Sequence, residues 1–190
     1  MNQDILHLLH RRIAGTSIGA STARGMGPKG TIAAARSYLA GLDISRFSVS
    51  SEKEFQAVLN RVTRAYVKKL PTGAQYWGPA RKFMNIFLRG LLYNKYLCAA
   101  YELSHIEPWL EVPLDSYVAK GLRGENGGKE LPRWKTVIGL DARTNTRYQR
   151  FATNVAAEKG IYRVHLDLFY WRRPATAANK ALQRRRRPRR

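Results

Sequence analysis

Apolar residues recur every three or four positions along most of this chain, the spacing of helices that pack on one face. Residues 2–14 predict a short amphipathic helix. Its apolar side consists of Ile5, Leu8, Leu9 and Ile13. Ser51 and Glu54 form a capping box, and the apolar stripe that follows them predicts a helix ending near Leu70.

The second half of the chain continues the same pattern. Residues 79–101 are apolar nearly all round, which predicts a long central helix. Residues 144–159 predict another helix, ended by Gly160, and residues 163–173 predict a last one. No strand pairing and no internal repeat stands out, so we expect an all-α fold.

A further helix is expected to start at Asp115, after a loop over residues 103–114. Aspartate caps helices well because its carboxylate accepts backbone N–H groups of the first turn. Val118 and Leu122 then fall on one apolar face. A carboxylate at this position can also stabilise a cation that forms just outside the helix. Capping and catalysis are both open at this stage.

The predicted central helix carries one polar stripe. Lys82, Asn85 and Arg89 follow one another at helical spacing and share a face. Such a stripe either faces solvent beside a cleft or performs chemistry. Trp77 lies just before this helix and Trp109 lies in the loop before Asp115, so these two aromatic residues are candidates for stacking on a base.

Composition restricts the partners. The chain has 34 Lys and Arg against 13 Asp and Glu, a formal charge of +21, and its length of 190 residues suits one main domain. The terminal run 183–190 holds six arginines, and removing them still leaves +15. A polyanion is therefore the natural partner. No apolar run is long enough to anchor the chain in a membrane.

The expected organisation has three parts. Residues 1–30 form an N-terminal helix and a glycine-rich flexible linker, residues 31–174 form the helical domain, and residues 175–190 form a disordered basic tail. The single cysteine, Cys98, is expected to be buried, and the chain has no zinc-ligand spacing. We therefore expect a cytoplasmic monomer without metal or cofactor.

Three segments resemble, in the same order, the archaeal 8-oxoguanine DNA glycosylases of the helix-hairpin-helix superfamily. They are Gly-Pro-Ala-Arg-Lys-Phe-Met-Asn-Ile at 78–86, the run around Pro-Leu-Asp-Ser-Tyr-Val at 112–120, and Gly-Ile-Tyr-Arg-Val-His-Leu-Asp-Leu-Phe-Tyr-Trp at the end of 155–171. The resemblance implies a two-lobed helical fold with a cleft between the lobes. It also implies that Asp115 is catalytic and that double-stranded DNA binds with one base flipped out.

The resemblance has one departure, at the nucleophile. Counted back from Asp115, the family's lysine corresponds to Asn85, and an amide cannot form a Schiff base with the sugar. We therefore expect a monofunctional glycosylase that leaves an abasic site, with Asn85 holding a water or an edge of the base. A shift by one helical turn would instead make Lys82 the amine of a bifunctional glycosylase/lyase.

The remaining expectations concern DNA contacts and competing functions. The candidate DNA-binding residues are Trp77, Trp109, Arg81, Arg89 and Lys120. His165 and Asp167 match a family motif, for which a structural role at a helix start is expected. The excised base is left open, as is the choice between DNA repair and defence against modified viral DNA. A basic nucleic-acid-binding protein without enzymatic activity is the competing interpretation, and an interaction protein for an acidic partner is a third.

Overall fold

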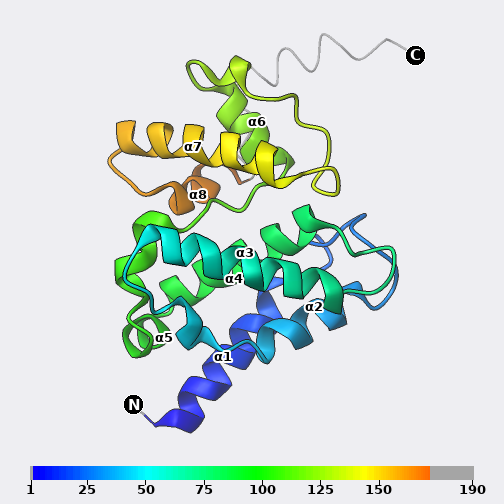
Figure 1. Cartoon of the computed structure of the whole chain (residues 1–190), viewed down its shortest axis with the longest axis vertical. Coiled ribbons are helices and arrows are strands. Elements are labelled where there is room, and N and C mark those ends of the chain that lie inside the picture. The colour runs from blue at the N-terminus through cyan, green and yellow to red at the C-terminus, as the bar shows by residue number, and fades with distance from the viewer. Residues whose placement is uncertain (1, 172–190) are drawn as a thin grey trace, which may run out of the picture.

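The computed structural model describes residues 2–171 and consists of helices joined by loops and turns (Figure 1). The α-helices are α1 (Gln3–Ser17), α2 (Thr31–Ala40), α3 (Glu52–Lys69), α4 (Trp77–Tyr93), α5 (Lys95–Ala100), α6 (Ser116–Gly124), α7 (Ala142–Glu158) and α8 (Leu166–Tyr170). Short 3-10 helices are η1 (Ile44–Phe47), η2 (Leu103–Trp109), η3 (Gly128–Glu130) and η4 (Arg163–His165). Residues 2–171 contain no strand, so the all-α prediction is confirmed for this part of the chain.

The buried apolar side chains form two clusters. The larger one is built mainly from α1 to α5 with η1 and η2, and includes Phe55, Phe83 and Phe87. The smaller one is built mainly from α6 to α8 and includes Val118 and Tyr148. In Figure 1 the helices α6, α7 and α8 lie as one layer beside α3 and α4. Residues 110–114, called the connector below, first carry the chain from the larger cluster to the smaller one, and Val137 and Val164 later return to the larger cluster.

Two helix starts are confirmed in detail. The Ser51 hydroxyl accepts the Glu54 amide at 3.3 Å, and the Glu54 carboxylate accepts the Ser50 amide at 3.0 Å, which fixes the first turn of α3. The Asp115 carboxylate accepts the amides of Tyr117 at 2.9 Å and Val118 at 3.0 Å, which starts α6. These side chains satisfy backbone donors that a helix cannot pair internally.

The helix predicted over 79–101 is two helices in the structure. Asn94 interrupts it, because its side-chain oxygen accepts the amides of Tyr96 at 3.2 Å and Leu97 at 3.0 Å and so caps α5. The last predicted helix begins with the 3-10 turn η4 and continues as α8. The predicted end at 173, the boundary at 174 and the basic tail lie outside the described residues.

The N-terminal prediction needs two corrections. In α1 the buried residues are Leu6, His10 and Ala14, whereas Ile5 and Leu8 are exposed. The segment 15–30 is not a linker, because α1 extends to Ser17 and Ile18, Ala23 and Met26 belong to the larger cluster. Its glycines permit turns, and its few apolar residues attach those turns to the core.

Two smaller points complete the description. Cys98, expected to be buried, is half-exposed. Across residues 2–171 we find no helix with both the length and the apolar character needed to cross a bilayer.

Candidate active site

Helix α4 approaches its neighbours closely at Gly78. A Cβ atom there would lie 1.9 Å from the Val137 carbonyl oxygen, so no larger residue fits without moving the backbone. The next residues, Pro79 and Ala80, are buried, and Pro79 suits the first turn, where no internal amide partner is needed. The Gly-Pro-Ala-Arg run therefore lets the start of α4 pack against residues 137–140.

The amine of Lys82 on α4 lies beside the carboxylate of Asp115 at the start of α6. Their Nζ and Oδ2 atoms are 3.9 Å apart, and Nζ donates to the Thr22 carbonyl at 3.1 Å. The Lys82 side chain is 7% exposed and that of Asp115 is 21% exposed. Because Oδ1 of Asp115 is occupied by the helix cap, Oδ2 is the oxygen that faces the amine. Sequence counting gave Asn85 the position opposite Asp115 and kept Lys82 as the alternative, whereas the side chain that pairs with Asp115 is that of Lys82.

The surroundings of Lys82 favour its neutral form. Burial lowers the pKa of the amine below its ordinary value of 10.5, and the Asp115 charge opposes this only in part. A neutral amine is a nucleophile, whereas an ammonium is not. The pair thus combines an amine that loses its proton more readily than an exposed lysine with a carboxylate that retains access to solvent.

Asn85 lies one helical turn beyond Lys82 but contacts a different acid. Its Nδ2 atom donates to Oε2 of Glu111 at 3.0 Å, and its side chain is buried. Its Oδ1 atom has no hydrogen-bond partner among the described residues. Asn85 therefore has one unpaired acceptor that is enclosed by the protein, on the same face of α4 as Lys82.

Arg81 does not fit the predicted contact with DNA. Its guanidinium is buried and binds Glu111 through two nitrogens, each 2.8 Å from a carboxylate oxygen. A phosphate would have to displace Glu111 from a site closed to solvent. The prediction failed because sequence spacing cannot tell an inward-facing arginine from an outward-facing one.

Arg89 pairs with Asp167 of α8, so its guanidinium is also engaged. Both ring nitrogens of His165 form hydrogen bonds. Nε2 lies 2.7 Å from the Glu107 carboxylate, and Nδ1 lies 2.8 Å from the Tyr93 hydroxyl. The family-like His165 and Asp167 thus tie η4 and α8 to η2 and α4. A structural role for both residues agrees with these contacts.

The two tryptophans chosen as stacking candidates both lie within packed surroundings. Trp109 is half-buried against the larger cluster, with its ring 6.3 Å from that of Phe55. Trp77 is half-buried, and the Arg81 guanidinium lies over its ring. The Cζ atom of Arg81 is 5.3 Å from the centroid of that ring. Each ring thus already makes a contact within the fold. Tyr117, in the first turn of α6, is 55% exposed instead.

Lys120 is exposed on α6, as a phosphate contact requires. Sequence reasoning missed two residues of the site. Thr22 contributes only a backbone carbonyl, which no side-chain pattern reveals. Glu111 carries a usable signal, an acid within the apolar run Trp109–Leu114, where an unpaired charge would be costly.

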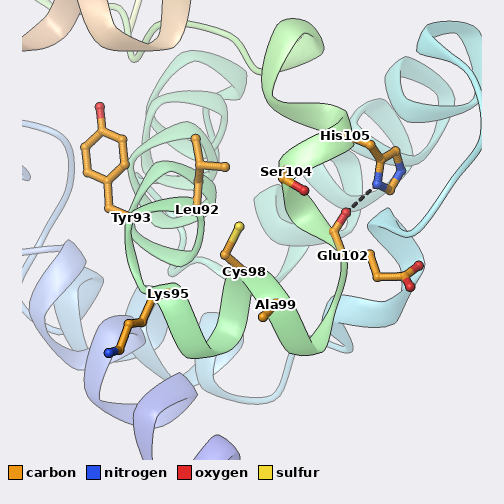
Figure 2. A pocket seen from close by; sticks show the side chains of 8 residues that line it. All are labelled: Leu92, Tyr93, Lys95, Cys98, Ala99, Glu102, Ser104 and His105. Atoms are coloured by element: carbon orange, nitrogen blue, oxygen red, sulfur yellow. Dashed lines mark hydrogen bonds between the residues drawn. The ribbon is translucent and has the colours of Figure 1, made fainter.

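Two cavities lie away from the Lys82–Asp115 pair. One, of about 700 Å³, is lined by α4, α5 and η2; Figure 2 shows Tyr93, Cys98 and His105 around it. Burial and the Glu107 charge raise the pKa of the Cys98 thiol, which disfavours the reactive thiolate. The second, of about 640 Å³, lies near Glu107 and His165. The thiol of the first cavity is therefore not activated.

Among residues 2–171, no group of three or more His, Cys, Asp or Glu residues is placed to hold a metal ion. Searches of protein-family models, curated proteins and solved structures find no match to this chain.

Proposed function

We propose that this protein is a DNA N-glycosylase in which Asp115 stabilises the sugar cation and the Lys82 amine attacks the anomeric carbon. The observation that carries the proposal is the buried amine of Lys82, 3.9 Å from the Asp115 carboxylate, in a chain of charge +21. A basic protein that binds DNA gains nothing for phosphate binding from an acid at this position. A carboxylate that can stabilise a sugar cation, next to an amine whose pKa is lowered by burial, is the pair that a glycosylase with lyase activity uses.

The chemistry follows from the two side chains. Breaking an N-glycosidic bond develops positive charge on the sugar, which the nearby carboxylate of Asp115 stabilises. The neutral Lys82 amine adds to the anomeric carbon as the bond to the base breaks, Oδ2 of Asp115 accepts the proton that the new C–N bond releases, and the departing base takes up a proton from this acid or from water. The bond from the anomeric carbon to the ring oxygen then breaks, the oxygen takes a proton, and the adduct becomes a Schiff base. The resulting Schiff base would allow strand cleavage, so this arrangement supports the bifunctional form over the monofunctional one.

Asn85 takes a different role from the one that sequence counting gave it. It cannot replace the amine, and its amide nitrogen is bound to Glu111. Its unpaired Oδ1 atom is suited to accept a hydrogen bond from the attacking water in a hydrolytic reaction or from an N–H of the flipped base. This keeps the monofunctional reaction as the alternative outcome of the test.

DNA would be held by exposed basic side chains around the pair. Lys120 lies on α6, and Arg24 is exposed two residues after Thr22, whose carbonyl binds Lys82. Such contacts are independent of sequence and offset the few kcal/mol that base flipping costs. The two hydrophobic clusters, joined by the connector that leads to Asp115, are consistent with a two-lobed glycosylase fold. The substrate is proposed as a damaged or modified base in duplex DNA, in repair or in defence against viral DNA.

A non-enzymatic nucleic-acid-binding protein is the second candidate. The observation in its favour is that capping α6 already accounts for Asp115. On that view Lys82 and Asp115 are an ordinary buried pair, and the protein releases no base from any DNA.

The test starts with duplex DNA that carries one abasic site, because this substrate does not require the base to be known. We expect borohydride to trap a covalent protein–DNA adduct that Lys82→Met abolishes and that Lys95→Met, a change at an exposed lysine, leaves intact. An adduct that survives Lys82→Met would overturn the assignment of the amine.

Duplexes with oxidised, alkylated, deaminated and phage-modified bases then identify the substrate by mass spectrometry of the released base. If the base is released without a trapped adduct, and the DNA strand then breaks on treatment with alkali, the reaction is monofunctional. Absence of both adduct and base release would favour the binding protein.

A further inference from the structure

The connector is a buried segment without regular structure, so its backbone groups need partners from elsewhere. Side chains supply them. Arg163 donates to the carbonyls of Trp109 at 2.7 Å and Leu110 at 2.9 Å. The Gln149 amide of α7 accepts the Val112 amide at 3.0 Å and donates to the Val112 carbonyl at 2.8 Å. The course of this segment is thereby fixed up to the residues that lead into Asp115.

Glu111 is the only acid in the connector, and its carboxylate is fully enclosed by donors. Arg81 and Asn85 bind it from α4, and Asn145 binds it from α7 at 3.2 Å. Burial by itself raises the pKa of Glu111, but the Arg81 charge and these hydrogen bonds outweigh it and lower the pKa. The carboxylate therefore stays ionised while bound to two helices.

The position of this network relates it to the candidate site. Arg81, which holds Glu111, directly precedes Lys82 on α4, and Glu111 lies four residues before Asp115. The Arg81–Glu111 contact therefore fixes the connector against α4 immediately beside the amine. Two parallel N–H···O bonds define an orientation as well as a distance, which apolar packing does not.

We infer that Glu111 is the positioning residue that sets the separation of Lys82 and Asp115. The inference rests on the proposed function in that Glu111 affects catalysis only if Lys82 and Asp115 react with DNA. The NMR experiment described below does not depend on that function. Glu111 touches neither reacting group. It acts by holding the segment that carries Asp115 against the helix that carries Lys82, with Asn145 holding the same carboxylate from the side of α7.

The test measures whether Asp115 still acts on the Lys82 amine. Full-length protein with ¹³C-labelled lysine is titrated by NMR, and the Lys82 signal is assigned by its loss in Lys82→Met. In the otherwise native protein Asp115→Asn should lower the pKa of Lys82, because the Asp115 charge raises it. In the Glu111→Gln background the same change should shift that pKa by less than half as much.

A second variant guards against loss of folding in Glu111→Gln. Asn145→Ala removes one of the weaker bonds to Glu111 and should also reduce the effect of Asp115→Asn, whereas the control Asn154→Ala on the exposed face of α7 should not. If Asp115→Asn shifts the pKa of Lys82 as much in the folded variants of Glu111 and Asn145 as in the otherwise native protein, the inference is overturned.

Trapping on abasic DNA separates this inference from the proposed function. Glu111→Gln should slow adduct formation on the order of 10²-fold, the scale of an ångström-sized misplacement, with DNA affinity unchanged. If wild-type protein forms no adduct, the proposed amine chemistry fails, and the NMR comparison still decides the role of Glu111. A normal trapping rate in Glu111→Gln would contradict the inference.

Discussion

Helix α4 contributes adjacent cations to two acid–base pairs with opposite properties. Arg81 and Glu111 meet through two 2.8 Å contacts, and further donors surround the carboxylate. Lys82 and Asp115 are 3.9 Å apart, and the acid keeps some exposure to solvent. A saturated pair can hold structure but has no capacity for a substrate. An under-satisfied pair stabilises little and leaves both groups able to react.

The largest effect should come from breaking the saturated pair. Arg81→Met should lower the free energy of unfolding by about 3–5 kcal/mol, because it leaves the Glu111 carboxylate buried without its counter-charge. Lys82→Met, one residue away, should change stability by only about 1 kcal/mol or less, since the loss of a loose pair is offset by removal of a buried charge. Urea denaturation measures both. Equal losses would show that the two pairs are alike.

The reactive pair should show the reverse pattern. Asp115→Asn should reduce adduct formation and base release by about 10²-fold, the usual cost of removing an electrostatic stabiliser of the transition state. Stability should change by less than about 1 kcal/mol, because asparagine caps a helix as well as aspartate does. DNA affinity should stay similar or rise. Single-turnover assays with denaturation curves test this, and wild-type rates in Asp115→Asn would remove Asp115 from the mechanism.

The pH dependence distinguishes the pairs further. Since burial lowers the pKa of Lys82 below 10.5, the rate of adduct formation should rise with pH and level off below that value. The folded state binds fewer protons than the unfolded state between the two pKa values, so Lys82 also makes stability rise with pH there. Asp115→Asn should move the inflection to lower pH. An inflection at 10.5 or above would mean that the amine is not desolvated.

The smallest expected effect concerns the aromatic residue near the pair. Tyr117→Ala should weaken binding to abasic duplex DNA by roughly tenfold, the lower part of the range for one stacked base. Tyr96→Ala, which changes a similarly exposed tyrosine on α5, is the matched control and should have no effect. Fluorescence anisotropy at fixed salt gives both affinities. Equal affinities for the two variants would leave the site without an aromatic platform at this position.

Local signals in the sequence were sufficient for most elements. The capping box at Ser51, the cap at Asp115 and the apolar faces of α3 and α6 depend on residues within one or two turns, and these predictions are confirmed. The break at Asn94 was missed because the apolar pattern continues across it. Helix α2 has a weak pattern of small residues, so its face is defined only by what packs against it.

The site depended on contacts that the sequence does not encode locally. Periodicity placed Lys82, Asn85 and Arg89 on one stripe, and tertiary packing then gave each a different acid: Asp115, Glu111 and Asp167. These acids lie 26 to 78 residues farther along the chain. The sequence by itself determined which groups were available and how α4 orders them. Only the folded arrangement decided which basic side chain is saturated with partners and which has a looser acid beside it, because burial and charge pairing arise between segments distant in sequence.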